Sequence, residues 1–259
     1  MLRFKQNAVN AKWLTYGFGF IGTLAVSLAF IAASGLPAMA QSTIFNIPST
    51  DTVEKKKVYF EYDQYVQAPK DSGSDRLSIF LPRGVVGVTK TIEAGANIGV
   101  THVGGLNQVY FQPNMKWKFF SDEKSATAGT VGAILFTPVN NRSGNDTYGL
   151  LYANFSKKVG KLGPRLTVGP YGVVGGKNAF AGVIKAGAIV GFEHGVYKRL
   201  SFVSDWFSGK NGFGYWTPGI SISLPKNGLF NAGYSIGNDS YNGNSTHNRL
   251  VFLYYGITL

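Results

Sequence analysis

In RLVFLYYGITL, the last stretch of the sequence (Arg249–Leu259), the character of the side chains alternates with a period of two residues. Its odd-numbered positions from Val251 onward are apolar without a break, whereas its even-numbered positions mix aromatic residues with Gly256 and Thr258. This alternation predicts a β-strand that lies between two different environments. No polar residues follow the strand. If its edge stayed unpaired, the free N–H and C=O groups would recruit other chains. We therefore expect it to close against the first strand, and in lipid such closure is compulsory.

The same stretch resembles the C-terminal strand of Gram-negative outer-membrane β-barrels, which the barrel assembly machinery reads as an insertion signal. Those proteins commonly end in Phe, where this chain has Leu259. The resemblance implies a barrel in the outer membrane of a Gram-negative bacterium, with the assembly machinery and outer-membrane lipid as partners. It points to a class of protein and to no particular family.

The first forty residues have the features of an export signal. Basic residues come first, an apolar run follows from about Leu14 to Ala33, and Ala38 and Ala40 flank Met39 as a small-x-small cleavage site. We predict a signal peptide over 1–40. The alternative is an uncleaved membrane anchor, because the apolar run approaches the length of a transmembrane helix.

The remaining chain divides into two parts. Residues 41–56 carry Pro48, a Ser/Thr/Asp cluster and a run of lysines, so we predict an irregular N-terminal leader that could fold back into the barrel as a plug. Residues 57–259 contain strand-like segments of about ten residues, each ended by turn residues. We predict that 57–259 form the β-barrel.

Charge and cysteine content narrow the class of protein further. The formal charge of +12 falls to about +9 once the three basic residues of the predicted signal are removed. An exported protein seldom meets nucleic acid, and no basic run alternates with stacking aromatic residues, so we expect no nucleic-acid partner. Lipopolysaccharide, phospholipid headgroups or small anionic solutes are the expected anionic partners. The chain has no Cys, which excludes a disulfide framework and a lipoprotein anchor.

The predicted fold class is all-β, an antiparallel transmembrane β-barrel of about 12 strands with a range of 10–14. In Ile92–Thr101 one face is wholly apolar and the other is polar or Gly. A β-sandwich would alternate too, so the connections decide between the two folds. The longest linkers are expected at Ala68–Arg76, Val139–Asn145 and Asn238–His247, and each joins an odd strand to an even one, as in a barrel with long loops at one end. The predicted strands are 57–66, 78–89, 91–103, 107–119, 126–137, 146–156, 164–174, 180–193, 199–208, 213–223, 229–237 and 248–259.

The sequence offers little evidence for catalysis. His102, His194 and His247 fall near predicted strand ends or loops, and none has a partner at metal-ligand spacing. Outer-membrane phospholipases and proteases are barrels with a catalytic His, but the stretch Asn244–Asn248 does not form a preorganised nucleophile and base. We predict no catalytic, cofactor or metal site, and no enzyme activity.

Charged residues that alternate with apolar ones must point into the lumen if the apolar face meets lipid. The pore-lining candidates are Arg83, Lys116, Lys185, Glu61, Asp63, Arg165 and Asp205. Arg83, Lys116 and Lys185 are expected near mid-depth, where unpaired cations would favour anions. The alternative is that these charges pair with one another and fill the barrel.

The function expected from this pattern is a porin-like passive channel for small hydrophilic, preferentially anionic solutes. The leading alternative is a non-conducting structural or adhesion barrel that acts through its extracellular loops. An outer-membrane enzyme comes third, and a soluble β-sandwich last.

Overall fold

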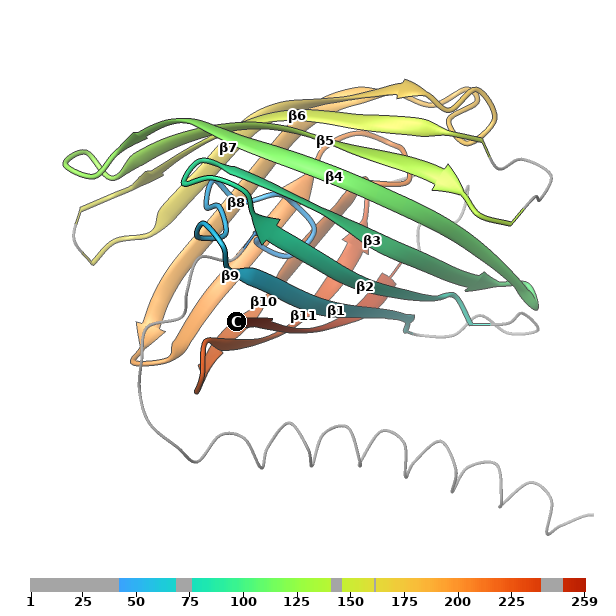
Figure 1. Ribbon diagram of the computed structural model, residues 1–259. Coiled ribbons are helices and arrows are strands. Elements are labelled where there is room, and N and C mark those ends of the chain that lie inside the picture. The colour runs from blue at the N-terminus through green and yellow to red at the C-terminus, as the bar shows by residue number, and fades with distance from the viewer. Residues whose placement is uncertain (1–41, 69–75, 141–145, 161, 239–248) are drawn as a thin grey trace, which may run out of the picture. The chain divides into compact units, whose positions relative to one another are not determined.

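The computed structural model describes residues 42–68, 76–140, 146–160, 162–238 and 249–259. These residues form twelve antiparallel strands that close into one barrel, in which each strand pairs with its neighbours in sequence and β12 pairs with β1 (Figure 1). The predicted class and the preferred strand number are confirmed. The search of these residues for helices long and apolar enough to cross a membrane found none. The predicted signal peptide lies outside the described residues.

The strands are β1 Val58–Gln67, β2 Ser78–Gly87, β3 Ile92–Val103, β4 Leu106–Asp122, β5 Thr127–Pro138, β6 Tyr148–Lys158, β7 Arg165–Gly175, β8 Ala186–Tyr197, β9 Leu200–Phe207, β10 Tyr215–Leu224, β11 Gly228–Gly237 and β12 Arg249–Thr258.

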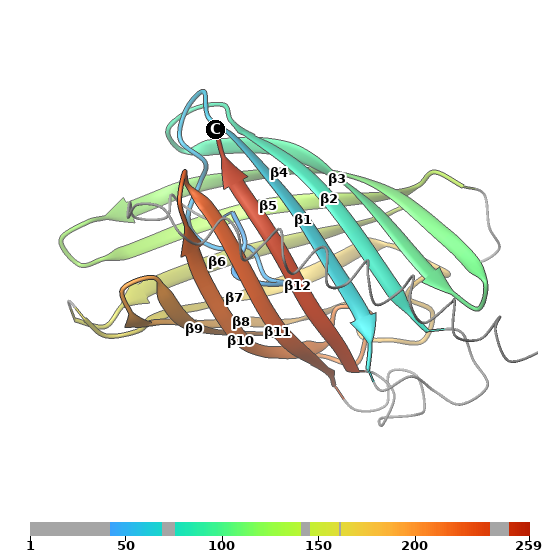
Figure 2. The ribbon, with the colours of Figure 1, turned by 90° about the horizontal axis from the view of Figure 1, so that it is seen from below.

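The last strand closes the sheet, as the alternation of its residues predicts. β12 lies between β1 and β11, and its pairing with β1 sets Tyr255 opposite Tyr62 (Figure 2). Val58, the first residue of β1, and Leu259, which follows β12, exchange both backbone hydrogen bonds, at 3.2 and 2.8 Å. The barrel therefore has no free edge strand, which removes the hazard that the terminal sequence would otherwise carry.

Connections of different length gather at the two ends of the barrel. Val58 and Leu259 lie at one end together with the connections β2–β3, β4–β5, β6–β7, β8–β9 and β10–β11, and we call it the turn end. The opposite end, the loop end, carries the other connections, including the three longest predicted linkers, parts of which lie outside the described residues. One connection of the loop end is short, because Gly104 and Gly105 turn the chain between β3 and β4 with positive φ at both positions.

The largest error in a predicted strand boundary is at the start of β8. The prediction starts a strand at 180, whereas β8 begins at Ala186. The Asp146 carboxylate accepts hydrogen bonds from the backbone N–H groups of Asn178 and Ala179, at 2.9 and 3.1 Å, and Phe180 N–H binds the Gly176 carbonyl at 3.0 Å. These local bonds hold residues 176–183 in turns, so the apolar alternation there does not extend the strand.

Each strand presents an apolar face outward. Ile98 and Met115 are 47% and 57% exposed, while their inward neighbours Asn97 and Lys116 are buried. Exposed Trp117 lies opposite Ile92 near the turn end, and exposed Trp206 pairs with Trp216 near the loop end. An apolar band bordered by aromatic residues is the surface that a bilayer requires.

The outward assignment of β12 can be tested at its centre. We expect Leu253→Arg to cost about 2–4 kcal/mol of folding free energy in a bilayer, because the guanidinium would face the middle of the hydrocarbon layer. Leu259→Arg should cost about 0–1 kcal/mol, since this exposed residue lies at the rim. The folded fraction can be measured in lipid vesicles by heat-modifiable migration on gels. Equal losses for both variants would contradict the assignment.

Candidate functional site: the occupied barrel lumen

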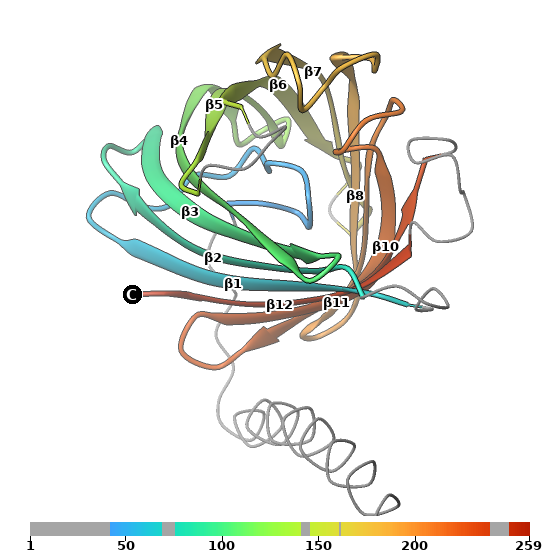
Figure 3. The same ribbon diagram turned by 90° about the vertical axis from the view of Figure 1, so that its right-hand side faces the viewer.

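An N-terminal segment lies inside the barrel. Residues Ser42–Val53, which we call the leader segment, are enclosed by the strands and drawn in blue (Figure 3). The segment begins as a small hairpin, in which Ile44 N–H binds the Ile47 carbonyl at 2.8 Å and Ser49 N–H binds the Ser42 carbonyl at 3.1 Å. Ile44, Phe45 and Ile47, at the tip of this hairpin, are all buried. The leader segment therefore occupies space that the strand side chains leave.

Asp205 on β9 holds the tip of the hairpin. Its Oδ2 atom accepts the backbone N–H groups of Phe45, Asn46 and Ile47 at 3.0, 2.5 and 2.9 Å, and its Oδ1 atom accepts the Asn46 side-chain amide at 3.0 Å. Four N–H groups converge on one carboxylate, which is a strong arrangement because the acceptor is charged. A buried turn would otherwise leave these donors unsatisfied.

Asn46 extends the attachment to two more strands. Its side-chain amide donates to Thr217 Oγ1 on β10 at 2.7 Å, and its carbonyl oxygen accepts the Tyr65 hydroxyl of β1 at 2.9 Å. The tip of the hairpin thus joins β1, β9 and β10.

The first residues of the leader segment lie between two ion pairs of the opposite wall. Lys116 on β4 and Glu93 on β3 pair at 2.9 Å, and both side chains are only 3% exposed. Lys116 Nζ also donates to the Ser42 carbonyl at 2.8 Å, while Glu93 accepts the Ser42 hydroxyl and, at 2.7 Å, the Val53 N–H. Both ends of the leader segment are therefore fixed to a single buried ion pair.

The second ion pair joins Arg83 of β2 to Glu61 of β1 at 2.9 Å. Thr43 lies between the two groups, since its hydroxyl donates to Glu61 at 3.4 Å and accepts from Arg83 at 3.3 Å. Arg83 Nε also donates to Asn97 Oδ1 at 3.0 Å.

A third set of charges lies further along the segment. Arg165 on β7 donates to Glu193 on β8 at 2.7 and 2.9 Å and to Asp51 of the leader segment at 2.6 Å. Burial acts to raise the pKa of Asp51, but the Arg165 guanidinium lowers it, and the net pKa lies below the usual aspartate value. Asp51 is thus a charged partner of Arg165 at neutral pH.

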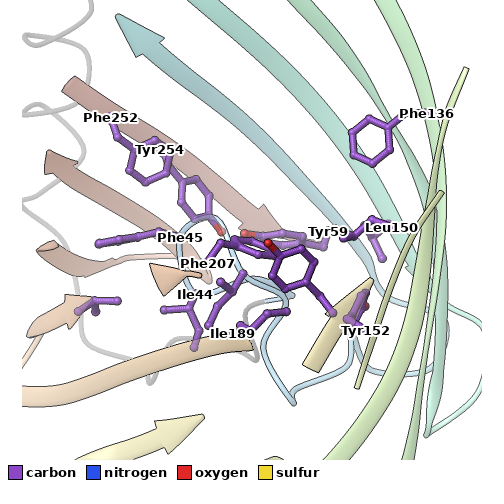
Figure 4. Packing of buried hydrophobic residues seen from close by; sticks show 14 of the residues in the cluster. Ile44, Phe45, Tyr59, Phe136, Leu150, Tyr152, Ile189, Phe207, Phe252 and Tyr254 are labelled. Atoms are coloured by element: carbon purple, nitrogen blue, oxygen red, sulfur yellow. The ribbon is translucent and has the colours of Figure 1, made fainter. Parts of the chain in front are cut away.

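Apolar contacts and two glycines complete the fit. Phe45 packs edge-on against Phe252 of β12, with ring centroids 5.3 Å apart, and Ile44 lies in the same buried cluster as Ile189 of β8 (Figure 4). A Cβ atom on Gly191 would lie 2.5 Å from Ile44 Cδ1, and one on Gly219 would lie 2.9 Å from Phe45 Cε2. A side chain at Gly191 would press on the flexible end of Ile44, and one at Gly219 would meet the wall itself first, because the Ala232 carbonyl lies 2.3 Å from the Cβ position.

The structure brings six of the seven pore-lining candidates to the lumen. Glu61, Asp63, Arg83, Lys116, Arg165 and Asp205 all lie on inward-facing strand positions. Five of the six contact the leader segment, whereas Asp63 has no hydrogen bond to it among the described residues.

Lys185 is the exception, and its predicted place at mid-depth is wrong. It precedes β8 at the loop end, where its Nζ atom is exposed and donates to the Gly175 carbonyl at 2.7 Å. The cause is the same set of local turns that delays the start of β8.

The inward charges are balanced differently from the sequence-based expectation. Each of the three inward basic side chains named above, Lys116, Arg83 and Arg165, pairs with a carboxylate. Asp63 and Asp205 have no such basic partner among the described residues, so the carboxylates are in surplus. Among the inward cations only half-buried Lys118, on the same face of β4 as Lys116, forms no ion pair in the described part of the chain, so the lumenal charges give little support to a preference for anions.

Aromatic side chains narrow the lumen near the loop end. The aromatic cluster consists of Tyr110, Phe136, Tyr148, Tyr171, Phe180, Phe207 and Phe213. Phe180 and Phe213 come from the loops β7–β8 and β9–β10 and stack on each other with centroids 5.8 Å apart. Buried Asn211 ties the two loops together, because its amide donates to the Ile184 carbonyl at 2.9 Å and to the Tyr171 hydroxyl at 2.8 Å.

Within the described residues, the two histidines belong to no candidate metal site. His102 Nδ1 lies 2.8 Å from Asn107 Oδ1 in an exposed pair, His194 is on β8, and His247 lies outside the described residues. A search of the described part of the chain finds no group of three His, Cys, Asp or Glu side chains that could hold a metal ion.

Comparison with solved structures finds membrane barrels of similar extent. An outer membrane channel from Pseudomonas putida F1 is 14% identical, with a TM-score of 0.49, and the match covers 81% of this chain and 97% of that one. Outer membrane phospholipase A from Escherichia coli is 11% identical, with a TM-score of 0.46, over 77% of this chain and 92% of that one. No family model and no curated protein matches the sequence.

This chain has the fold of an outer-membrane β-barrel. Its closed antiparallel sheet and its outward apolar face establish the fold by themselves. The two similar structures include a channel and an enzyme, and at these identities and TM-scores they carry no argument about function.

The role of Asp205 in holding the hairpin can be measured by hydrogen exchange. Asp205→Ala leaves the N–H groups of Phe45, Asn46 and Ile47 without their acceptor, and an unmade buried hydrogen bond costs about 1–3 kcal/mol. We expect these amides to exchange at least about tenfold faster than in the unchanged protein. The matched control is Asp63→Ala, which removes a buried lumenal carboxylate without touching the hairpin. Unchanged protection in Asp205→Ala would contradict the assignment.

Asn211 offers a test of the loop end. We expect Asn211→Ala to release the loops β7–β8 and β9–β10, because the hydrogen bond that joins them through Ile184 and the one that ties loop β9–β10 to Tyr171 of β7 are lost. Limited proteolysis of the folded barrel should then cut within 176–185 or 208–214, while the exposed neighbour Lys210→Ala should leave the cutting rate unchanged. Equal resistance of both variants would mean that ring stacking alone holds the loops.

Proposed function

We propose that the protein is a channel of the outer membrane for small hydrophilic solutes, and that its own leader segment closes it in this conformation. The observation that carries the proposal is that a segment which is not part of the barrel wall occupies the lumen. Residues Ser42–Val53, which precede the barrel, fill the lumen between the wall residues that bind them, while the aromatic cluster narrows it separately near the loop end. A passage closed by a separate segment can open without unfolding the wall.

The size of the barrel supports this interpretation. Eight strands leave room only for side chains, whereas wide barrels leave a channel or hold a plug. With twelve strands the lumen accommodates a hairpin together with the ion pairs that bind it. Hydrogen bonds to charged or polar wall residues hold the segment, and water can substitute for them when the segment leaves, whereas Ile44, Phe45 and Ile47 would lose apolar contacts.

The charges of the wall favour a weak preference for cations in the open channel. Without Asp51, the lumen retains Glu61, Asp63, Glu93, Glu193 and Asp205 on the acidic side. Arg83, Lys116, Arg165 and half-buried Lys118 of β4 remain on the basic side, so the acidic surplus is one. An acidic surplus in a narrow passage raises the local concentration of cations. The preference for anions expected from the sequence stays a prediction, now without support from these charges.

The alternative function is a non-conducting structural or adhesion barrel. It is favoured by the close fit of the leader segment, since Lys116 and Glu93 are almost fully buried beneath it. That the protein lacks enzyme activity and cofactors also stays a prediction.

Conductance in planar bilayers tests the proposal. A variant without residues 42–53 should give stable ion conductance, and full-length protein should conduct only in brief openings. The deletion variant must first show heat-modifiable migration, which proves that the barrel is folded. A folded deletion variant that does not conduct would contradict the channel and favour the structural barrel.

A disulfide lock gives a second readout in the full-length chain. The hydroxyl groups of Thr50 in the leader segment and Ser156 on β6 are hydrogen-bonded, so cysteines there should lie within reach of a disulfide. The chain has no other Cys. We expect Thr50→Cys with Ser156→Cys to abolish the openings when oxidised and to restore them when reduced. Each single variant, which cannot form the bond, is the control.

A further inference from the structure

The surplus positive charge of the exported chain is located mainly at the turn end of the barrel. Lys90, Lys124, Lys198 and Lys226 occupy four of its five turns, and Lys158 ends β6 at the fifth. Lys55–Lys57 add three more basic residues directly before β1. We call these residues the basic rim.

The ammonium groups of the basic rim are available to a partner. Lys90, Lys124, Lys158, Lys198 and Lys226 are all exposed. Among the described residues, the ion pairs all lie in the lumen, and none involves the rim. Glu54, Asp122 and Glu123 are the acidic residues at the turn end, too few to neutralise it.

The loop end is less basic than the turn end. Its connections and strand ends carry four acidic residues, Asp71, Asp75, Asp146 and Asp239, against seven basic ones, which are Lys70, Arg76, Arg142, Lys177, Lys185, Lys210 and Arg249. The surplus of basic residues there is three, whereas the eight lysines of the basic rim exceed the three acidic residues of the turn end by five.

The position of the rim relative to the apolar band identifies the kind of partner. Outward-facing Trp117, Phe155 and Phe202 lie on strand segments close to the turn end and are exposed as lipid-facing residues. A lysine just beyond such a band keeps its aliphatic stem along the apolar surface and places its ammonium group at the level of lipid headgroups. Basic residues on every turn surround the barrel, as lipids do, whereas a protein partner would contact one side.

We propose that the basic rim binds anionic phospholipids, in the leaflet that surrounds the turn end of the barrel. The recognised chemistry is a phosphodiester headgroup with net negative charge, such as phosphatidylglycerol, in preference to the zwitterionic phosphatidylcholine. Lys ammonium groups bind phosphate as point charges, so the attraction falls as salt rises. The proposal depends on insertion of the barrel in a membrane and does not depend on conduction.

The tryptophans of the chain allow each end to be tested separately. Outside the predicted signal peptide they are Trp117, near the turn end, and Trp206 and Trp216, near the loop end. The variant Trp206→Phe with Trp216→Phe reports on the turn end alone, and Trp117→Phe reports on the loop end alone. Each is folded into vesicles of phosphatidylcholine that contain phosphatidylglycerol with brominated chains. Contact with brominated lipid quenches the fluorescence.

We expect Trp117 to be quenched several-fold more by brominated phosphatidylglycerol than by brominated phosphatidylcholine at equal mole fraction. The preference should disappear at high salt, where the Debye length is about 3 Å. Trp206 and Trp216 should show little preference. Equal preferences at the two ends, or none at Trp117, would overturn the proposal.

A pair of matched charge variants identifies the residues responsible. Lys90→Gln with Lys124→Gln removes the two exposed lysines in the turns on either side of β3 and β4, next to Trp117. It should reduce the phosphatidylglycerol preference at Trp117. Lys177→Gln with Lys210→Gln removes two charges from the loop end and should leave that preference unchanged. If both double variants lowered it equally, net charge rather than the rim would be the cause.

Discussion

The antiparallel pairing of β1 with β12 is the contact on which the rest of the structure depends. Without it the sheet would expose two rows of unpaired N–H and C=O groups, and in a bilayer no water could satisfy them. With it, the apolar residues of all twelve strands can face outward while every strand is paired on both sides. Closure also creates the lumen, so the charged residues of the strands have a place away from lipid.

The lumen presents its own physical problem, because buried charges are costly unless they are paired and hydrogen-bonded. The leader segment supplies much of what the wall lacks. Its backbone N–H groups satisfy Asp205, its Ser42 hydroxyl and carbonyl complete the Lys116–Glu93 pair, and Asp51 adds a second carboxylate to Arg165. The wall and the segment are thus complementary, and the same complementarity closes the passage. Because these bonds are polar, the closed state can be held firmly and still be exchanged for a hydrated one.

Net charge alone gave a misleading indication of the lumen. A chain with a surplus of basic residues suggests a positive pore, yet the lumen has a surplus of carboxylates and the basic surplus lies mainly on the turns. The distribution follows from solvation, since a lysine at the rim keeps its ammonium group in water whereas a lysine in the lumen needs a partner. Lys116 has such a partner in Glu93, whereas half-buried Lys185 at the loop end donates to the Gly175 carbonyl and forms no ion pair among the described residues.

The sequence by itself predicted the closed sheet, a strand number of about 12 within a range of 10–14, and the outward face of the strands that alternate cleanly. Successive side chains of a strand face lipid and lumen in turn, so the side-chain character alternates with a period of two, as in Ile92–Thr101 and in Val251–Leu259. It also determined that Glu61, Asp63, Arg83, Lys116, Arg165 and Asp205 point inward. The start of β8 was missed, because the turns near Phe180 depend on the carboxylate of Asp146, which is remote in sequence. Only the tertiary structure decided what fills the lumen and which charges are neutralised there. Those outcomes depend on distances between strands far apart in the chain and on a leader segment whose sequence has no periodic pattern. No local signal connects Asp205 with Asn46 or Lys116 with Ser42, since their contact exists only once the barrel has closed around the segment.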